Sequence, residues 1–260
     1  MCKVISVANQ KGGVGKTTTS INLGIGLAKK GKRVLLIDAD SQGSMTASLG
    51  IQEPDLLDYT LATVLGKIIN EEEPDLSEGI LVHDEGICFL PGNIELSGME
   101  ASLVNVMSRE FILKTYVNQL RGMFDYVIID CMPSLGMLTI NALVAADSVL
   151  IPVQTHFLSA KGLEQLIKTI GKIRRQLNPK LRIEGILPTM VNGRTVYSKE
   201  ILQLLKDGYG SRVDFFESSI PEAVKASEAS ALGVSIYKHD PKGKVAMAYE
   251  SLTREVLAHE

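Results

Sequence analysis

A glycine-rich stretch near the N-terminus, VANQKGGVGKTTTS at residues 7–20, has the residue types of a phosphate-binding loop. Gly12, Gly13 and Gly15 allow backbone N–H groups to converge on phosphate oxygens without obstruction by side chains. Lys16 can pair with the β- and γ-phosphates of a nucleotide, and the Thr17 hydroxyl can bind Mg²⁺. A strand-like run precedes the stretch and a helical pattern follows it, so the phosphates would also meet the positive end of a helix dipole.

The same loop departs from the usual pattern G-x-x-x-x-G-K-[ST] at two neighbouring positions. Gln10 stands where that pattern has its first glycine, and a second lysine, Lys11, follows it. The loop therefore lacks one glycine and carries an additional positive charge. The role of Lys11 must be sought outside the ordinary phosphate loop.

Two carboxylates end the apolar run of VLLIDADSQGSMT, residues 34–46. Side chains alternate along a strand, so Asp38 and Asp40 share one side of the strand end. Ligands of open α/β sheets bind outside the carboxyl ends of the strands. The spacing therefore predicts that both aspartates face the nucleotide site.

A third carboxylate, Asp130, ends the apolar run of FDYVIIDCMPSLG, residues 124–136. A carboxylate in this position fits a Walker B motif, which binds Mg²⁺ through water. Cys131 follows directly but has no histidine or second cysteine near it in the sequence. We interpret Cys131 as a buried thiol.

Apolar runs alternate with amphipathic segments along the chain. β-Branched runs predict strands over 3–8, 33–38, 125–130, 148–153 and 183–189, and helical periodicity predicts helices over 16–30, 108–121, 136–146, 157–177, 196–206 and 242–258. This alternation predicts an α/β fold, a doubly wound and mostly parallel sheet flanked by helices. We expect one domain over residues 1–260, with an exposed acidic loop over 70–79.

Composition and charge narrow the class of protein. The chain has 260 residues with 45% hydrophobic and 22% charged residues, and no apolar run reaches the roughly eighteen residues of a membrane span. The N-terminus shows no signal-peptide pattern, and the three cysteines have no disulfide or metal-ligand spacing. Acidic residues outnumber basic ones over 1–150, and the reverse holds over 151–260. Either a basic face for an anionic polymer or an unevenly charged surface explains this asymmetry.

KGGVGKTT, with the two aspartate motifs, resembles the deviant Walker A group of ParA/MinD ATPases, in the signal-recognition-particle-like branch of P-loop proteins. The resemblance implies ATP and Mg²⁺ as ligands and an ATP-sandwich dimer, in which Lys11 reaches the partner subunit's nucleotide. It assigns water orientation to Asp40 and the magnesium shell to Asp38, Asp130 and Thr17. Implied nucleotide contacts are Lys11, Gly12, Gly13, Val14, Gly15, Lys16, Thr17 and Thr18, with Lys11, Lys16 and Asp40 as the catalytic set. Ser41 and Met132 replace prolines of the family pattern.

The second half of the chain resembles ParA-type proteins in TMVNGRT and in the block that begins SSIPEAVKASEA. The resemblance implies contacts with the adenine base at Met190, Asn192 and Pro221. It also implies non-specific DNA binding through basic residues of the C-terminal half: Arg194, Lys199, Lys206, Lys225, Lys242 and Lys244. Glu222 stands where the family often has arginine, so binding near that position should be weaker.

The resemblance predicts an ATPase that partitions a chromosome, plasmid or mobile element and hydrolyses ATP slowly on its own. Its expected location is the cytoplasm and the nucleoid. Its expected partners are a second copy of the chain, non-specific double-stranded DNA and a ParB-like centromere-binding protein. The alternative is a MinD-like positioning ATPase at a membrane. Because the C-terminal segment carries Glu250, Glu255 and Glu260, we expect no stable membrane association. Iron–sulfur or ligase chemistry on the same core remains a further alternative.

Overall fold

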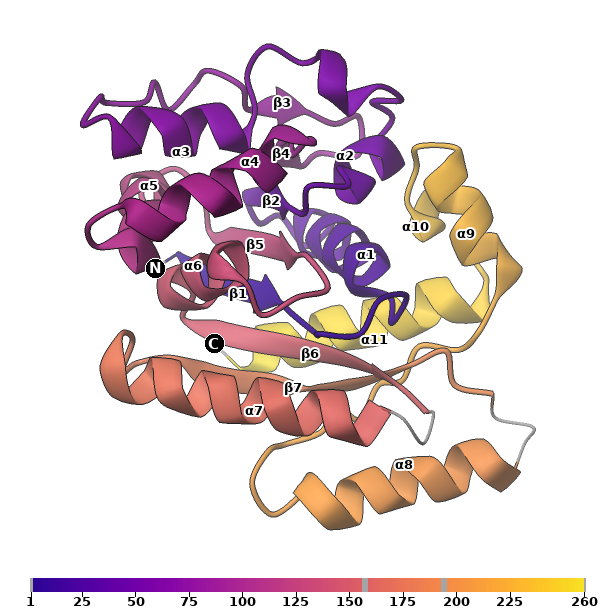
Figure 1. Ribbon diagram of the computed structural model, residues 1–260. Helices are drawn as coiled ribbons and strands as arrows, with labels where there is room; N and C mark the ends of the chain where they lie inside the picture. Colours follow the sequence, from indigo (N-terminus) through magenta and orange to yellow (C-terminus); the bar gives the residue numbers. More distant parts are fainter. Residues whose placement is uncertain (1, 156–158, 193–195, 260) are drawn as a thin grey trace.

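The structure, a computed structural model, describes residues 2–155, 159–192 and 196–259, without the side chains of 159–161, 196, 197 and 199. Its centre is a seven-stranded sheet with the order β3-β4-β2-β5-β1-β6-β7, parallel except for the β3–β4 pair (Figure 1). The strands are β1 (Lys3–Val7), β2 (Val34–Ala39), β3 (Leu81–Val82), β4 (Cys88–Leu90), β5 (Tyr126–Cys131), β6 (Ser148–Gln154) and β7 (Arg182–Thr189).

Helices cover both faces of the sheet, and each face has its own apolar core. One core packs beneath α1 (Lys16–Ala28), α2 (Ser44–Ser48), α9 (Val224–Ala231), α10 (Ile236–His239) and α11 (Lys244–Ala258). The other packs beneath α3 (Leu61–Ile69), α4 (Glu95–Ser102), α5 (Ile112–Leu120), α6 (Met137–Ala145), α7 (Ser159–Gln176) and α8 (Val196–Tyr209). Because both faces of the central strands are buried, those strands are apolar throughout rather than alternating.

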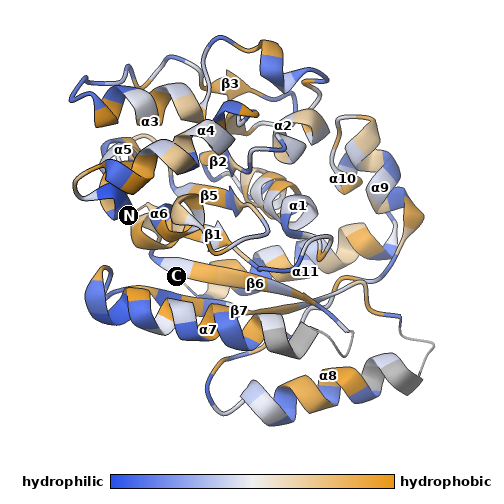
Figure 2. Ribbon diagram, in the orientation of Figure 1, coloured by the Kyte–Doolittle hydropathy of each residue, from blue (hydrophilic) through white to orange (hydrophobic). Residues whose placement is uncertain are grey.

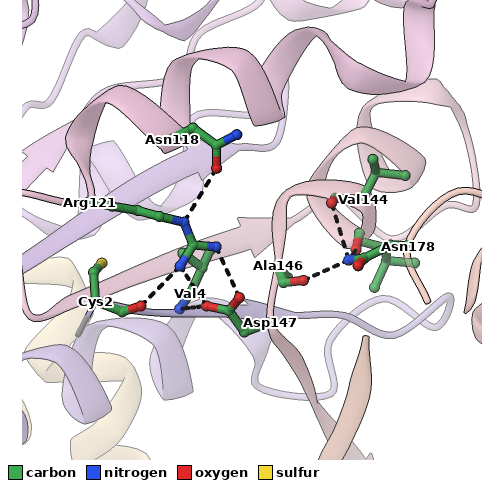
Figure 3. Close-up of polar contacts among 9 residues, drawn as sticks. Cys2, Val4, Asn118, Arg121, Val144, Ala146, Asp147 and Asn178 are labelled. Carbon is green, nitrogen blue, oxygen red and sulfur yellow. Dashed lines mark hydrogen bonds and ion pairs between the residues drawn. The ribbon is translucent and has the colours of Figure 1, made fainter. Parts of the chain in front are cut away.

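Hydrogen bonds stabilise the turns at the amino ends of the central strands, far from the phosphate loop (Figure 3). The guanidinium of Arg121 makes two 2.9 Å bonds to Asp147 and donates to the carbonyl of Cys2, and Asp147 also accepts the Val4 N–H. The buried amide of Asn178 donates to three carbonyls at the end of α6: Leu143, Val144 and Ala146. These bonds hold the segments that precede β1 and β6, the strands whose other ends lie at the phosphate loop.

The structure confirms the predicted fold class, the five predicted strands and the six predicted helices, with small shifts of their ends. The 70–79 segment is a loop that is mostly exposed, as expected. The sequence analysis did not predict β3, β4 and the helices α2–α4, α9 and α10. Across the described ranges, none of the helices combines the length and the apolar character that crossing a membrane requires.

Candidate nucleotide site

The loop between β1 and α1 is shaped to surround an anion. Gly13 and Gly15 adopt φ values of 68° and 84°, in the left-handed region that favours glycine. A Cβ atom added to Gly12 or Gly13 would meet no atom within 4 Å, so this side of the loop is open to a ligand. α1 begins at Lys16, and its free N–H groups point toward the same opening.

The two lysines of the loop lie in different environments. Lys16 is buried, and its ammonium Nζ donates to the carbonyl of Lys11 at 3.3 Å. Burial lowers the pKa of Lys16, an effect that the carboxylate of Asp130 opposes. Lys11 is only half-buried at the mouth of the loop. The loop thus holds one cation inside the subunit and another at its surface.

Gln154, at the end of β6, connects Lys11 to the rest of the site. Its Oε1 accepts from Lys11 Nζ at 3.0 Å, and its Nε2 donates to the carbonyl of Gly13 at 2.8 Å. The same Nε2 lies 2.7 Å from Sδ of Met190, whose backbone has a φ of 50°. One amide therefore links the phosphate loop to the loop that follows β7.

Asp130 is fully buried beside the start of α1. Its Oδ2 accepts from the Thr17 hydroxyl at 2.7 Å, and its Oδ1 accepts from the Ser20 hydroxyl at 2.9 Å. Burial raises the pKa of Asp130 to about 7, Asp38 adds to the shift, and the two hydroxyl bonds oppose it.

Asp38 lies beside Asp130 because the two residues are partners in the β2–β5 register. Its Oδ2 accepts two bonds from Thr46, from the backbone N–H at 2.9 Å and from the hydroxyl at 2.7 Å. The Thr46 hydroxyl in turn accepts the N–H of Gly92 at 3.0 Å. Burial raises the pKa of Asp38 to about 6, and the bonds from Thr46 oppose the shift.

This arrangement fits a magnesium–nucleotide complex. Two adjacent buried carboxylates have raised pKa values because neither negative charge is adequately solvated. A divalent cation would relieve that charge, and carboxylate and hydroxyl oxygens are the ligands that Mg²⁺ prefers. The open side of the glycine loop supplies room for the phosphates.

Asp40 directly follows β2, two residues after Asp38. It is 7% exposed, and its Oδ1 accepts the N–H of Gln42 at 3.0 Å. Its own N–H donates to Asp38 Oδ1 at 3.3 Å. Ser41, which replaces a proline of the family pattern, is also buried, and the Gly43 N–H closes the turn by donating to the Asp40 carbonyl at 3.0 Å.

Two of the three predicted base contacts share one cavity. Asn192 and Pro221 line a hollow of about 1200 Å³ beside α11. The segments that carry them are joined by a bridge between Val191 and Pro221. Met190 is instead directed toward Gln154.

The predicted DNA contacts do not form one cluster. Arg194 and the side chain of Lys199 lie outside the described residues. Lys206 is exposed on α8, across the sheet from the other three. Lys225 pairs with Asp240 at 3.0 Å, while Lys242 and Lys244 are exposed at the start of α11.

Three residues of the site were missed by the sequence analysis: Ser20, Thr46 and Gln154. Ser20 and Thr46 end the stretches 7–20 and 34–46, and Gln154 ends β6, but the motif pattern itself assigned none of them a role. Gln154 carried a weak signal, because a polar residue ends an otherwise apolar run in VLIPVQ.

A parallel sheet whose first strand leads through a glycine loop into a helix, with carboxylates at the ends of the next strands, defines a P-loop α/β protein. The AAA domain family matches residues 2–183. The sporulation initiation inhibitor protein Soj of Bacillus subtilis is 42% identical over 259 residues, and the match spans 100% of this chain and 100% of Soj. The chromosome partitioning protein ParA of Caulobacter vibrioides is 39% identical, over 99% of this chain and 95% of its own length.

Solved structures agree with this class. Cobyrinic acid a,c-diamide synthase from Mycobacterium smegmatis with bound ADP and magnesium is similar at a TM-score of 0.86 and 39% identity, over 100% of this chain and 95% of that one. A plasmid partition protein from Borrelia burgdorferi bound to AMPPNP is similar at a TM-score of 0.82 and 25% identity, over the whole of both chains. The chain belongs to the ParA/Soj family of P-loop ATPases.

Proposed function

We propose that this chain is a partitioning ATPase that segregates a chromosome, a plasmid or another mobile element. ATP-bound subunits form a homodimer that binds duplex DNA non-specifically, and a ParB-like centromere-binding protein stimulates hydrolysis and releases the DNA. Residues 1–260 act as one ATPase domain, in the cytoplasm and on the nucleoid. The similarity to Soj and ParA over nearly the whole of each chain supports this proposal.

The main support for an ATP-bound dimer is that Lys16 and Lys11 lie in different environments. Lys16 is buried within its own loop, whereas Lys11 is at the surface and bonds to a neutral amide. A cation delivered from a second subunit to the transferring phosphate would act as an arginine finger does. The half-buried position of Lys11 supports that role, because exchanging its bond to Gln154 for one to a phosphate exposes no buried charge.

The remaining roles are those that the family resemblance implies, and the positions of the side chains support them. Thr17 and Asp130, with Asp38 beside them, would hold Mg²⁺, which would supply positive charge near the nucleotide phosphates. Lys16 and the N–H groups of the loop bind the phosphates. Asp40 orients the attacking water, and Asn192 and Pro221 lie beside the base.

The dimer can be tested with Lys11→Ala. Light scattering with ATP should show a dimer for the unaltered chain and a monomer for the variant, and the variant's ATP turnover should fall at least tenfold. Lys29→Ala, at the exposed end of α1, is the matched control and should behave as the unaltered chain. A Lys11→Ala chain that dimerises and turns over ATP normally would refute the role of Lys11.

The role of Asp40 has a separate test. Asp40→Ala should keep ATP binding and dimerisation but lose turnover, because it removes the group that orients water and leaves the phosphate contacts in place. Calorimetry and phosphate release measure the two properties independently. Normal turnover would show that another group positions the water.

Membrane positioning of the MinD kind is less well supported. The apolar side of the C-terminal helix α11 is buried against α1 through residues such as Val245, Tyr249 and Leu252. A membrane anchor would need that surface free.

The similarity to the M. smegmatis cobyrinic acid a,c-diamide synthase structure suggests a ligase as the competing function. An amide-forming ligase would release ADP or AMP only with its acid and nitrogen substrates present. ATP turnover that rises with DNA and a ParB-like protein, and does not depend on such substrates, would favour partitioning.

A further inference from the structure

A basic segment without acidic residues lies at the end of α7 and the beginning of β7. Between Glu164 and Glu184 the sequence has no acidic residue. It has six basic ones, all exposed, which we call the α7–β7 basic end: Lys168, Lys172, Arg174, Arg175, Lys180 and Arg182. Figure 2 shows hydrophilic residues along this end of α7, on the side of the molecule away from the phosphate loop.

Most of this charge is not neutralised locally. Lys168 pairs with Glu164 at 2.7 Å, but the other five have no ion pair with any residue that the structure describes. The nearest acids have other partners. Asp147 is held by Arg121, as Figure 3 shows, and the buried Glu184 pairs with Lys3 at 2.8 Å and His259 at 3.1 Å.

A groove of about 1000 Å³ runs beside this surface, and Arg174, Lys180 and Arg182 lie along it. Asp214 is the exposed carboxylate that also lines the groove. Counted with Lys3, the lining has four cations against three carboxylates, Asp147, Glu184 and Asp214, so the groove has a small positive balance.

The C-terminal surface that family resemblance favours is less basic in this chain. Lys225 is paired with Asp240. Lys244 lines the same cavity as the carboxylates of Glu217 and Glu222, and Glu222 is exposed. Acidic residues therefore offset the positive charge of this C-terminal surface, whereas the positive charge of the α7–β7 basic end is mostly not offset.

The chemistry of the basic end suits phosphate better than protein. Among the described residues 162–184, no large apolar side chain is exposed. Protein interfaces depend on apolar and aromatic anchors, whereas non-specific nucleic-acid contacts depend on lysine and arginine at phosphates. Lys168, Lys172 and Arg175 follow one helix face, about one turn or 5.4 Å apart, and can each reach a different phosphate.

We propose that the α7–β7 basic end is the principal duplex-DNA surface of this chain. The proposal rests on the proposed function for DNA as the partner and adds which surface binds it. The contacts are to backbone phosphates, so binding is independent of sequence and strongly dependent on salt.

The test uses the full chain with ATP, Mg²⁺ and a fluorescent random duplex, titrated at several salt concentrations. The triple variant Lys172→Ala, Arg175→Ala, Lys180→Ala should lose at least tenfold in affinity. Its log–log salt slope should fall by about 2.7 for each subunit that contacts DNA, since each phosphate contact contributes about 0.9. ATP turnover without DNA should not change, because these residues lie away from the nucleotide site.

A matched triple variant, Lys206→Ala, Lys225→Ala, Lys242→Ala, removes the same charge from the surfaces that family resemblance favours. We expect its DNA affinity to stay within threefold of the unaltered chain. The conservative pair Lys172→Arg, Lys180→Arg should bind normally, which supports loss of charge rather than loss of fold as the cause.

Two outcomes separate this inference from the proposed function. If the unaltered chain binds DNA with ATP and the α7–β7 variant binds equally well, the surface is wrong and the proposed function stands. If the unaltered chain does not bind DNA at low salt with ATP, the proposed function fails. Normal DNA binding by the variant, together with lost binding to phosphatidylserine vesicles, would assign the surface to a membrane and overturn the proposal.

Discussion

Replacement of Thr46 by valine tests whether the contacts behind the carboxylates hold the site together. Thr46 is fully buried and connects three segments, since its hydroxyl donates to Asp38 and accepts the N–H of Gly92. Valine keeps the shape of the side chain and removes only the hydroxyl. Asp38 then loses a hydrogen bond, and the Gly92 N–H is left without its acceptor.

The size of the effect follows from these two losses. A hydrogen bond to a charged group contributes about 1.5–3 kcal/mol, and a buried polar group without a partner costs about 1–3 kcal/mol. The additional apolar group returns at most about 0.8 kcal/mol. We therefore expect the free energy of unfolding to fall by about 3 kcal/mol, which for a chain of this length lowers Tm by roughly 6–12 °C.

Urea unfolding followed by circular dichroism measures this difference without nucleotide. Thr115→Val is the matched control, because Thr115 is exposed and its hydroxyl bonds only to the Phe111 carbonyl of its own helix. It should change stability by less than about 0.5 kcal/mol. A Thr46→Val chain within about 1 kcal/mol of the unaltered one would refute the reasoning.

Three other perturbations have defined outcomes. Gln154→Ala removes the amide that donates to the Gly13 carbonyl of the phosphate loop and should weaken ATP binding by roughly tenfold, about 1.4 kcal/mol, so an unchanged calorimetric Kd would contradict the role of this amide. Asn178→Ala leaves three carbonyls at the end of α6 without their donor and should lower the free energy of unfolding by about 2–3 kcal/mol, against no measurable change for the exposed Asn118→Ala. Burial raises the pKa of Tyr237 to about 12. The stability that neutral Tyr237 contributes is therefore complete below its ordinary pKa of about 10 and is lost as pH rises through 12. Urea midpoints that stay constant from about pH 10 to 12 would contradict this.

The sequence predicted the strands and helices that have strong local patterns. The β2 run VLLIDA and the β5 run YVIIDC are continuous apolar segments, and their burial on both faces is the reason for that composition. The short strand β4, Cys88–Leu90, lies in a run of only four apolar residues, ICFL. It pairs with the edge of β2, with Leu35 opposite Cys88 and Ile37 opposite Leu90. A strand this short depends on tertiary pairing, and its local signal is weak.

The site shows the same division between local and long-range causes. The glycines, Lys16, Thr17 and the aspartates were recognisable because phosphate and magnesium chemistry requires those residue types at fixed spacings. Thr46 and Gln154 were not, because no fixed spacing marks a threonine or a glutamine as part of such a site. Gln154 meets Lys11 and Gly13, and Thr46 meets Gly92, only after the strands have assembled.

The position of Lys11 illustrates what the fold adds to a recognised motif. The sequence marks Lys11 as a second cation, and family resemblance directs it to a partner's nucleotide. In the single subunit Lys11 bonds to Gln154, whose amide also holds Gly13 and Met190. A dimer that recruits Lys11 must first break this bond, and the released amide would remain attached to the phosphate loop and to the segment after β7. The movement of one lysine is thereby coupled to both sides of the nucleotide site, so dimerisation and nucleotide affinity should change together in variants of Gln154.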